Sequence, residues 1–317
     1  DLTNCISLRK IGNWNFYDMP NLESVDLSNL TNLMSIGDCC FGNVEKLTTV
    51  NFEGLTALQT IGGSFFTWGG ISTNAEIPVA ELNFSDCVSL ISIGDQAFWN
   101  MPNLKELDFT NTKLQSIGYK FIMHCDALET IKLPATLNGL NIGRQDSRGH
   151  LVEFMTFMPA LKEIVVAQDN PYLVVDNGAL MNTAKTTIYK YAVASQATTY
   201  VAPTTVLRVE GHAFYEAKNL TLIDFTNAKV QVIGFQAFAN CSNATLALGT
   251  NSNYSYGDGN TLYDKGVNWN TGLKEITFLL SFNIQIEGIE DGQETVEEVL
   301  TISVLATYAN ENCDVTV

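Results

Sequence analysis

The chain has 317 residues, of which 34 are acidic and 17 are basic, so its formal net charge at pH 7 is −17. Hydrophobic types make up 46% of the residues, which excludes a disordered chain and provides enough apolar material for a full core. Because this acidic chain offers little to compensate phosphate charge, we expect neither nucleic acid nor an anionic membrane as its main partner.

A repeat of about 25 residues starts near residue 11 and continues to about residue 249. Each copy carries an Ile-Gly dipeptide, replaced once by Val-Glu-Gly, and a large apolar residue usually follows five positions after the isoleucine. The leading residues are Ile11, Ile36, Ile61, Ile93, Ile117, Ile142, Val209 and Ile233, and the later ones are Phe16, Phe41, Phe66, Phe98, Ile122, Phe214 and Phe238. This period predicts a solenoid of about eight stacked coils.

The copies continue with an apolar-x-x-apolar-x-apolar pattern, as in Leu22-x-x-Val25-x-Leu27. The last two apolar residues are two positions apart, which predicts a short strand with both side chains directed into the coil. The glycine after the isoleucine predicts a turn that a Cβ would crowd. Strands of successive coils should then lie side by side in a ladder, which we expect to include Val25, Val50, Leu82 and Leu107.

Three segments carry a family resemblance. Residues 93–98 read Ile-Gly-Asp-Gln-Ala-Phe, residues 233–241 repeat this pattern up to a cysteine, and residues 125–134 read Cys-Asp-Ala-Leu-Glu-Thr-Ile-Lys-Leu-Pro. They resemble the BspA-like branch of the leucine-rich repeats over residues 1 to about 249. The resemblance implies a right-handed, mainly β coil with short parallel strands, and a non-enzymatic bacterial protein that adheres to host or bacterial macromolecules.

The chain departs from ordinary leucine-rich repeats, which place asparagine three residues after the strand. It holds Leu30, Leu55, Cys87, Thr112, Thr136 and Ala228 at these places. We therefore expect a second strand through the x-x-Ile-Gly segment to satisfy the backbone in place of an asparagine ladder.

Three insertions interrupt the period. Residues 67–77 are Gly-rich and residues 144–153 are polar, so both are predicted to be loops. Residues 168–205 contain a predicted hairpin with an Asn-Gly turn at 177–178, followed by strands at 187–189 and 199–201. We interpret 168–205 as an elaborated repeat of the solenoid.

The periodicity ends near residue 250, which divides the chain into a repeat domain, 1–249, and an acidic segment, 250–317. That segment holds 11 acids and two lysines. Ile276–Ile286 and Val299–Tyr308 are predicted strands around an exposed acidic loop, Glu287–Glu298, with a helix at Thr295–Leu300 as the alternative. We expect a β-rich cap that seals the last coil.

The first residues align with the interior of a repeat, since Leu2 and Ile11 match Leu27 and Ile36. We therefore expect that a segment upstream of residue 1 is missing, and that a secretion signal or a surface attachment belonged to it. No run of 18 apolar residues occurs, so no transmembrane segment is predicted.

No catalytic, metal or cofactor site is predicted. The histidines are His124, His150 and His212, and none lies in a catalytic or metal-binding motif. Cys125 next to His124 is interpreted as a buried, inert thiol. The acidic stretches 258–260 and 287–291 lack EF-hand spacing and are interpreted as solvated loops.

The outward side chains of the predicted strands should form two polar, mildly acidic columns. The candidate ligand-binding residues on them are Asp26, Asn51, Glu81, Asn83, Glu106 and Asp108. Tyr17, Trp99 and Tyr215 follow the large apolar residue of their repeats and are further candidate anchors, because Tyr and Trp dominate interface hot spots. The alternative is that these rings are ordinary, partly buried turn residues. Trp68, in the first insertion, is another candidate.

The sequence thus predicts a non-enzymatic protein, secreted or attached to the bacterial cell surface, that presents an extended surface to a protein or glycan. An envelope scaffold, or an accessory protein that captures polysaccharide, is the alternative, and an ordered array of Trp and Tyr ring faces in one groove would favour polysaccharide capture. An enzyme within 250–317 is a third possibility, opposed by the absence of histidine there.

Overall fold

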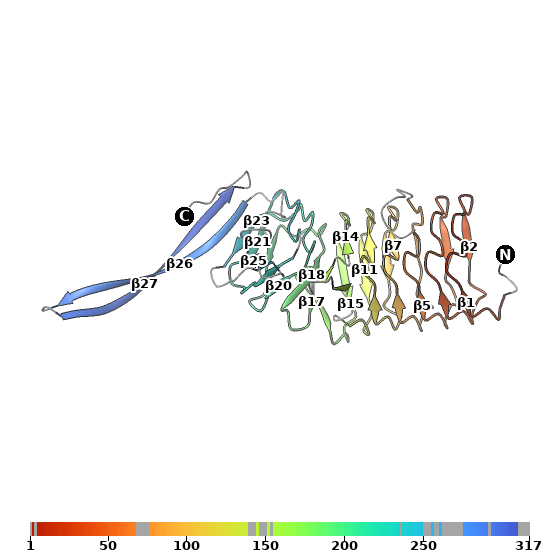
Figure 1. Cartoon of the computed structure of the whole chain (residues 1–317), viewed down its shortest axis with the longest axis horizontal. Helices are drawn as coiled ribbons and strands as arrows, with labels where there is room; N and C mark the ends of the chain where they lie inside the picture. The colour runs from red at the N-terminus through yellow and green to blue at the C-terminus, as the bar shows by residue number, and fades with distance from the viewer. Residues whose placement is uncertain are drawn as a thin grey trace.

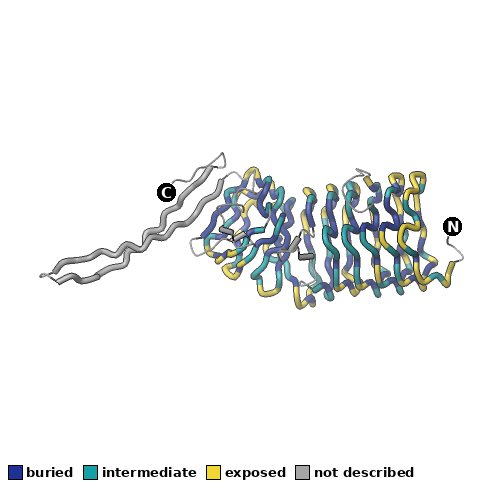
Figure 2. The backbone as a smooth tube through the Cα atoms, viewed as in Figure 1, coloured by how far each residue is buried: buried dark blue, intermediate teal, exposed yellow. Residues whose placement is uncertain are grey.

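A computed structural model describes residues 2, 5–67, 76–138, 155–234 and 236–249, together with the strand backbones at 144–145, 151–152, 255–256, 260–261, 275–290 and 293–309. These residues form a β-solenoid of about nine turns, stacked along one axis (Figure 1). The described residues contain short, mostly parallel strands and no helix. The buried residues line the inside of the coils along the whole stack (Figure 2).

The first sheet contains the Ile-Gly isoleucines. Its five parallel strands pair in coil order, with Ile11 beside Ile36 and Ile36 beside Ile61. The strands are β1 (Lys10–Ile11), β3 (Ser35–Ile36), β5 (Thr60–Ile61), β6 (Ser92–Ile93) and β9 (Ser116–Ile117). The second strand column expected through the Ile-Gly segment is therefore present, but it is not what satisfies the backbone at the asparagine positions.

The backbone where ordinary repeats carry asparagine is satisfied locally. The amide of Leu30 donates to the carbonyl of Leu27 at 2.9 Å, and Cys87 and Thr112 donate in the same way to Phe84 and Phe109. These short turns leave the side chain free to pack, so an aliphatic residue or cysteine replaces asparagine without leaving an unpaired amide.

The large apolar residues fill the middle of each coil. Phe41 stacks on Phe16 at 5.1 Å and on Phe66 at 5.9 Å between ring centroids, and Phe66 lies 6.3 Å from Phe98. From Phe98 onward, the backbone at this position forms a second, three-stranded sheet of β7 (Phe98–Trp99), β10 (Ile122–Met123) and β14 (Met155–Thr156), whereas Phe16, Phe41 and Phe66 lie in turns.

Turns with positive φ flank this apolar residue on both sides. Gln96 and Asn100 have φ of 57° and 59°, and Lys120 and His124 repeat the pair with 48° and 54°. The residues lie three and seven positions after the isoleucine, so the coil geometry imposes the left-handed conformation on whichever residue stands there.

The third column is the predicted strand ladder. β2 (Ser24–Asp26) pairs with β4 (Thr49–Asn51), which places Val25 beside Val50. Farther along, β8 (Glu106–Asp108), β11 (Thr130–Leu133) and β15 (Glu163–Val166) form one parallel sheet. Residues 76–84 form no assigned strand, so the hydrogen-bonded ladder is interrupted there. The packing continues nonetheless, because the Phe84 ring lies 5.0 Å from Phe52 and 5.2 Å from Phe109.

Most of the long insertion, residues 168–205, belongs to the solenoid. Its hairpin, β16 (Leu173–Asp176) and β17 (Ala179–Asn182), turns at Asn177 and Gly178, whose φ of 49° and 81° fit the predicted Asn-Gly turn. The next two strands occupy coil positions, since β18 (Thr187–Tyr191) pairs parallel with β20 (Arg208–Val209) and β19 (Thr199–Val201) with β21 (Leu222–Phe225). Residues 186–201 thus form an additional short coil, which brings the expected eight turns to about nine.

The solenoid ends in β22 (Val232–Ile233) and β23 (Thr245–Leu248), which pair in parallel with β20 and β21. Two small pairs of strands complete the described backbone away from the final hairpin. They are β12 (Arg144–Gln145) with β13 (Leu151–Val152), and β24 (Ser255–Tyr256) with β25 (Asn260–Thr261).

The C-terminal strands form a long hairpin. β26 (Glu275–Glu290) pairs parallel with β23 and antiparallel with β27 (Gln293–Ala309), and the pair projects beyond the last coil (Figure 1). The two predicted strands are present, but the loop predicted at Glu287–Glu298 and the alternative helix at Thr295–Leu300 are wrong. Antiparallel pairing continues through this acidic stretch to Glu290 and Gln293.

Candidate functional site

The outward face of the third column is polar, as predicted. In β2 the middle residue Val25 is buried while Ser24 and Asp26 are exposed. The same alternation places Asn51 on β4 and Glu106 and Asp108 on β8. Glu81 and Asn83 are exposed on either side of the buried Leu82, outside an assigned strand. All six predicted polar residues therefore point out of their coils.

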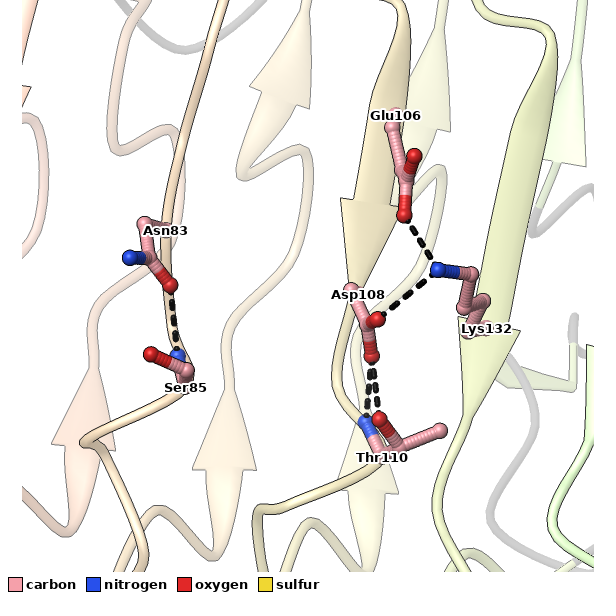
Figure 3. Close-up of polar contacts among 6 residues, drawn as sticks. All are labelled: Asn83, Ser85, Glu106, Asp108, Thr110 and Lys132. Atoms are coloured by element: carbon pink, nitrogen blue, oxygen red, sulfur yellow. Dashed lines mark hydrogen bonds and ion pairs between the residues drawn. The ribbon is translucent and has the colours of Figure 1, made fainter.

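The outward side chains that directly follow the buried strand residue form what we call the second outward column. Most of those described are hydrogen-bonded within their own coils. Asp108 Oδ1 accepts the amide of Thr110 at 2.9 Å, and Asn83 Oδ1 accepts the amide of Ser85 at 2.9 Å (Figure 3). The same bond is made by Asp26 with Ser28, Asn51 with Glu53, and Asp224 with Thr226. These side chains end the strand by satisfying the second amide after it. Their primary role is therefore to shape the turn.

The sequence carries a signal for these turns that the column analysis missed. Four of the five turns have serine or threonine two residues after the Asp or Asn, and the hydroxyls of Thr110 and Thr226 donate to the same carboxylates. An Asp-x-Thr or Asn-x-Ser motif after a buried strand residue favours this local bond.

The two carboxylates on β8, Glu106 and Asp108, share a cation. Lys132, one coil further, lies with Nζ 2.5 Å from Glu106 Oε1 and 3.0 Å from Asp108 Oδ2 (Figure 3). The hydrogen bond to Glu106 is the largest cause that raises the pKa of Lys132, and the hydrogen bond to Asp108 is the next largest. Although burial opposes it, bonds from Thr110 and Lys132 lower the pKa of Asp108. The exposed face is therefore mixed in charge at its middle.

Other asparagines and aspartates link the coils at the turn after Ile-Gly. Asn13 Oδ1 accepts the amide of Asp38 at 3.0 Å, and Asp38 Oδ1 accepts the amide of Gly63 at 2.7 Å. Asp95 repeats this bond with Tyr119 at 2.9 Å. These acidic side chains are therefore also engaged in holding the solenoid together, and the Ile-Gly-Asp/Asn motif signals it.

The three predicted aromatic anchors do not form one array. Tyr17 packs edge-to-face with Trp14 in the first coil, with 5.0 Å between centroids. Trp99 begins a separate row that continues through His124, 6.4 Å away, to Phe157, and Tyr215 lies 5.0 Å beyond Phe157.

Two rings of this row are stacked face to face. His124 and Phe157 are parallel within 2° at 4.5 Å, and the ammonium of Lys120 lies 5.7 Å from the Trp99 centroid. Burial is the main cause that lowers the pKa of His124. His124 was predicted to be structural and Phe157 was not singled out, because the insertion before it hides its place in the repeat. The four rings of the row are all partly buried.

The described thiols and acids show no reactive arrangement. Burial raises the pKa of Cys125 to about 12, and its Sγ lies 3.4 Å from the carbonyl of Phe98. Among the described side chains, no group of three His, Cys, Asp or Glu could hold a metal ion. Trp68, His150 and the acidic stretches at 258–260 and 287–291 lie outside the residues whose side chains are described. A search of the described residues for a helix able to cross a membrane found none.

The family profile described as BspA type leucine rich repeat region matches residues 2–87, 73–143 and 186–284, in six copies. No curated protein matches the chain.

The solved structures similar to the chain include three bacterial leucine-rich repeat or surface proteins. The pneumococcal vaccine antigen PcpA has 17% identity and a TM-score of 0.54, with 79% of this chain and 72% of that chain covered. A leucine-rich repeat protein from Eubacterium ventriosum has 20% identity and a TM-score of 0.45, covering 78% and 53%. A leucine rich cell surface protein from Faecalibacterium prausnitzii has 18% identity and a TM-score of 0.49, covering 77% and 66%. The chain thus spans about half of the Eubacterium protein, and the likeness to PcpA supports the fold.

Proposed function

Because the chain belongs to the BspA-type leucine-rich repeat family, we propose that it is a non-enzymatic bacterial protein, secreted or held at the cell surface, that binds a macromolecule through the polar face of its solenoid. This family is typically non-catalytic. In this proposal residues 1–249 form the binding domain, and residues 250–317 form a separate acidic segment that caps the last coil.

One observation carries the proposal. The outward side chains that directly precede the buried strand residue form the first outward column, which includes Ser24, Thr49, Glu81 and Glu106. All four are exposed, and among the described residues only Glu106 of these four is held in an ion pair. Neighbouring strands of a sheet lie roughly 4.8 Å apart, so Ser24 and Thr49 are adjacent on the paired strands β2 and β4, and Glu106 begins a second stretch of the row in the sheet of β8, β11 and β15. Glu81 lies between these two stretches, where the strand pairing is interrupted. A rigid row of this kind suits an extended ligand better than a small molecule.

The chemistry of the row indicates the class of partner. It offers hydroxyls and carboxylates, with Lys132 as a cation beside Glu106. A protein or glycan that donates hydrogen bonds and carries cationic or neutral groups complements it, whereas nucleic acid does not. The second column positions this row by ending each strand at the same place.

The proposal is tested by binding of the full chain to an array of extracellular-matrix proteins and glycans. The variant Glu81→Lys/Glu106→Lys reverses the charge of the row. Glu45→Lys/Glu76→Lys makes the same change in net charge at two exposed residues away from it. We expect the first variant to lose binding at least tenfold and the second to retain it. Equal binding by both variants, or no binding by the wild type, would overturn the proposal.

A further inference from the structure

The strand ladder of the third column is open between β15 and β19. The two strands belong to successive coils, which are joined just before them, where the amide of Ala194 donates to the carbonyl of Leu161 at 2.7 Å. Nevertheless β15 ends one sheet and β19 begins the next, and they do not pair with each other. We propose that an extended peptide segment of a partner protein docks in this gap as an additional strand, paired with the open edge of β19.

The edge of β19 that faces the gap carries unpaired backbone groups. Ala202 donates its amide to the carbonyl of Asp224 at 2.8 Å, so the even-numbered residues of β19 bond to β21. In a parallel strand, the amide and carbonyl of one residue point to one side and those of the next residue to the other. The groups of Thr199 and Val201 therefore face the gap, where no described residue bonds to them.

The edge of β15 on the other side of the gap is open in the same way. Ala167 donates its amide to the carbonyl of Leu133 of β11 at 3.0 Å, so the odd-numbered residues of β15 face β11. The amides and carbonyls of Ile164 and Val166 face the gap, and within the described part of the chain they have no hydrogen bond. Such an edge is complemented by another extended chain, which carries the same groups at the same spacing.

The other interruption of this ladder, between β4 and β8, does not offer the same site. Residues 81–83 of this chain run through the place of the strand there, with Leu82 buried and the residues on either side of it exposed. The Phe84 ring then packs between Phe52 and Phe109, at 5.0 Å and 5.2 Å between centroids. The chain itself thus fills that interruption and leaves no room for a strand from another protein.

The side chains beside the gap also differ from their equivalents elsewhere. In the second outward column the gap is flanked by Val165 and by Val201, which is 49% exposed. The column members of the other strands up to β21 are polar: Asp26, Asn51, Asn83, Asp108, Lys132 and Asp224. A valine cannot bond back to its own backbone to end the strand. Two β-branched apolar side chains instead provide a contact for an apolar side chain of the incoming strand, while the backbone provides the pairing.

The charge around the gap indicates which peptide fits. Glu163, on the outward face of β15, is exposed and has no ion pair among the described residues. The chain as a whole carries a net charge of −17. A segment with β-branched residues between basic ones therefore complements the site, and an acidic segment is repelled.

The experiment titrates the full chain with the acetylated and amidated peptide Lys-Thr-Val-Thr-Val-Thr-Lys in a calorimeter. We expect this peptide to bind. The same peptide with both valines replaced by proline should bind at least tenfold more weakly, because proline supplies no amide to the ladder. A peptide with glutamate in place of both lysines should bind at least threefold more weakly. No binding of the first peptide, or equal binding of the proline peptide, would overturn the proposal.

Two variants at one position test the edge of β19. Val201→Pro removes an amide that faces the gap and none of the bonds to β21, and proline is tolerated on an edge strand whose amide is unpaired. We expect Val201→Pro to weaken peptide binding at least tenfold. Val201→Thr keeps both the amide and the β-branched shape and should stay within threefold of the wild type. Equal binding by the two variants would contradict strand pairing.

Hydrogen exchange in the unmutated protein gives a readout that does not depend on a variant. The peptide should slow exchange at the amides of Thr199 and Val201, whereas those of Tyr200 and Ala202 already face β21 and should change little. Slowing at all four amides alike, or at none, would overturn the proposal. Slowing at Thr199 and Val201 without peptide, as the protein concentration rises, would also overturn it, because a second copy of the chain would then fill the gap.

The inference does not rest on the proposed function, since the gap lies on other coils than Glu81 and Glu106. Loss of macromolecule binding in Glu81→Lys/Glu106→Lys and loss of peptide binding in Val201→Pro are separate results. Failure of one proposal is therefore distinguishable from failure of the other.

Discussion

Gly118 lies directly on Gly94 of the preceding coil, and a Cβ built on Gly118 would come within 2.4 Å of the carbonyl carbon of Gly94. The same approach recurs where Gly94 meets Gly62 and Gly63, and where Gly62 meets Gly37. None of these glycines has a positive φ, so glycine is needed here for space and not for its backbone freedom.

Gly118→Ala should therefore destabilise the solenoid, by about 1–3 kcal/mol, because the clash involves backbone that can relax only by separating two coils. Gly12→Ala is the matched control, since its Cβ would meet the Asn15 side-chain amide at 3.0 Å and that side chain can move. Urea unfolding of both variants measures the difference. A Gly118→Ala variant as stable as Gly12→Ala would contradict the proposed reason for the Ile-Gly motif.

Alanine is usually more stabilising than glycine inside a regular element, but the positive φ of 48° at Ser64 predicts the opposite order for the alanine and glycine variants of this residue. Both variants lose the 3.3 Å hydrogen bond between Ser64 Oγ and Gln96 Oε1. The left-handed backbone is strained for alanine, which has a Cβ, but not for glycine. Ser64→Gly should be more stable than Ser64→Ala by about 1 kcal/mol.

Ser116, on β9 and without a positive φ, provides the control for this pair of variants. There alanine should be the more stable by roughly 0.5–1 kcal/mol, the usual order inside a regular element. Thermal unfolding of the four variants tests the prediction. The same order at both positions would show that coil geometry does not impose strain at Ser64.

Lys132→Met should raise the pKa of Asp108. In the folded wild type this pKa lies below its ordinary value of 3.8, so the carboxylate contributes stability above about pH 3.8 and loses it as the pH falls through the lower folded value. Removal of the ion pair brings the folded pKa of Asp108 closer to its ordinary value, so the carboxylate contributes less to stability. The stability advantage of the wild type over Lys132→Met should therefore shrink on acidification from pH 6 to below the folded pKa.

Carbonyl-carbon NMR titration of Asp108 measures the shift, and urea unfolding at several pH values measures its effect on stability. Lys162→Met, which breaks the separate ion pair with Glu129, should leave the pKa of Asp108 unchanged. An Asp108 titration that is identical in Lys132→Met and the wild type would exclude the role assigned to the ion pair.

The sequence predicted the repeat columns because one inward residue per strand recurs at a nearly fixed step, as at Val25 and Val50. It predicted the strands at 187–189 and 199–201 as part of one elaborated repeat but did not count them as a further coil, in which Tyr200 takes the inward position and the step from Ile188 to Val209 is shorter than in the other coils. A tyrosine there fits because its ring packs edge to face on Phe214 at 5.0 Å, a long-range contact that local sequence does not show.

The candidate polar residues were predicted with the correct orientation but with incomplete roles. Period-two alternation decides that Asp26 and Asp108 point outward. It does not decide that their carboxylates turn back to their own backbone, since that bond depends on how the strand ends. The pairing of Lys132 with Asp108 follows from stacking the columns, whereas the contact of His124 with Phe157 depends on a register that the insertion obscures.

Lys190 in the short coil is a buried amine. Its side chain is almost fully buried, and Nζ donates to the carbonyl of His212 in the next coil at 2.9 Å. In this coil the strand β18 runs directly from Ile188 to Tyr191, whose ring fills the middle of the coil. In the other coils a longer turn separates the Ile-Gly isoleucine from the large apolar residue. The carbonyl of His212 also accepts the amide of Tyr215 at 3.3 Å, so the Lys190 side chain adds a second bond, from the neighbouring coil, to this carbonyl.

Burial lowers the pKa of Lys190 to about 8 from 10.5, which sets the direction of its effect on stability. Between these two values the unfolded chain binds a proton that the folded chain does not, so stability rises with pH across this window. Relative to Lys190→Met, which keeps the volume but does not titrate, the wild type should gain on the order of 3 kcal/mol between pH 7.5 and 10.5. Urea unfolding of both proteins at each pH gives this difference and cancels the titration of the tyrosines and cysteines common to both. Lys185→Met, which removes a more exposed amine paired with Asp176, should show no such gain. A constant difference between the wild type and Lys190→Met across this pH range would mean that Lys190 stays charged in the folded coil.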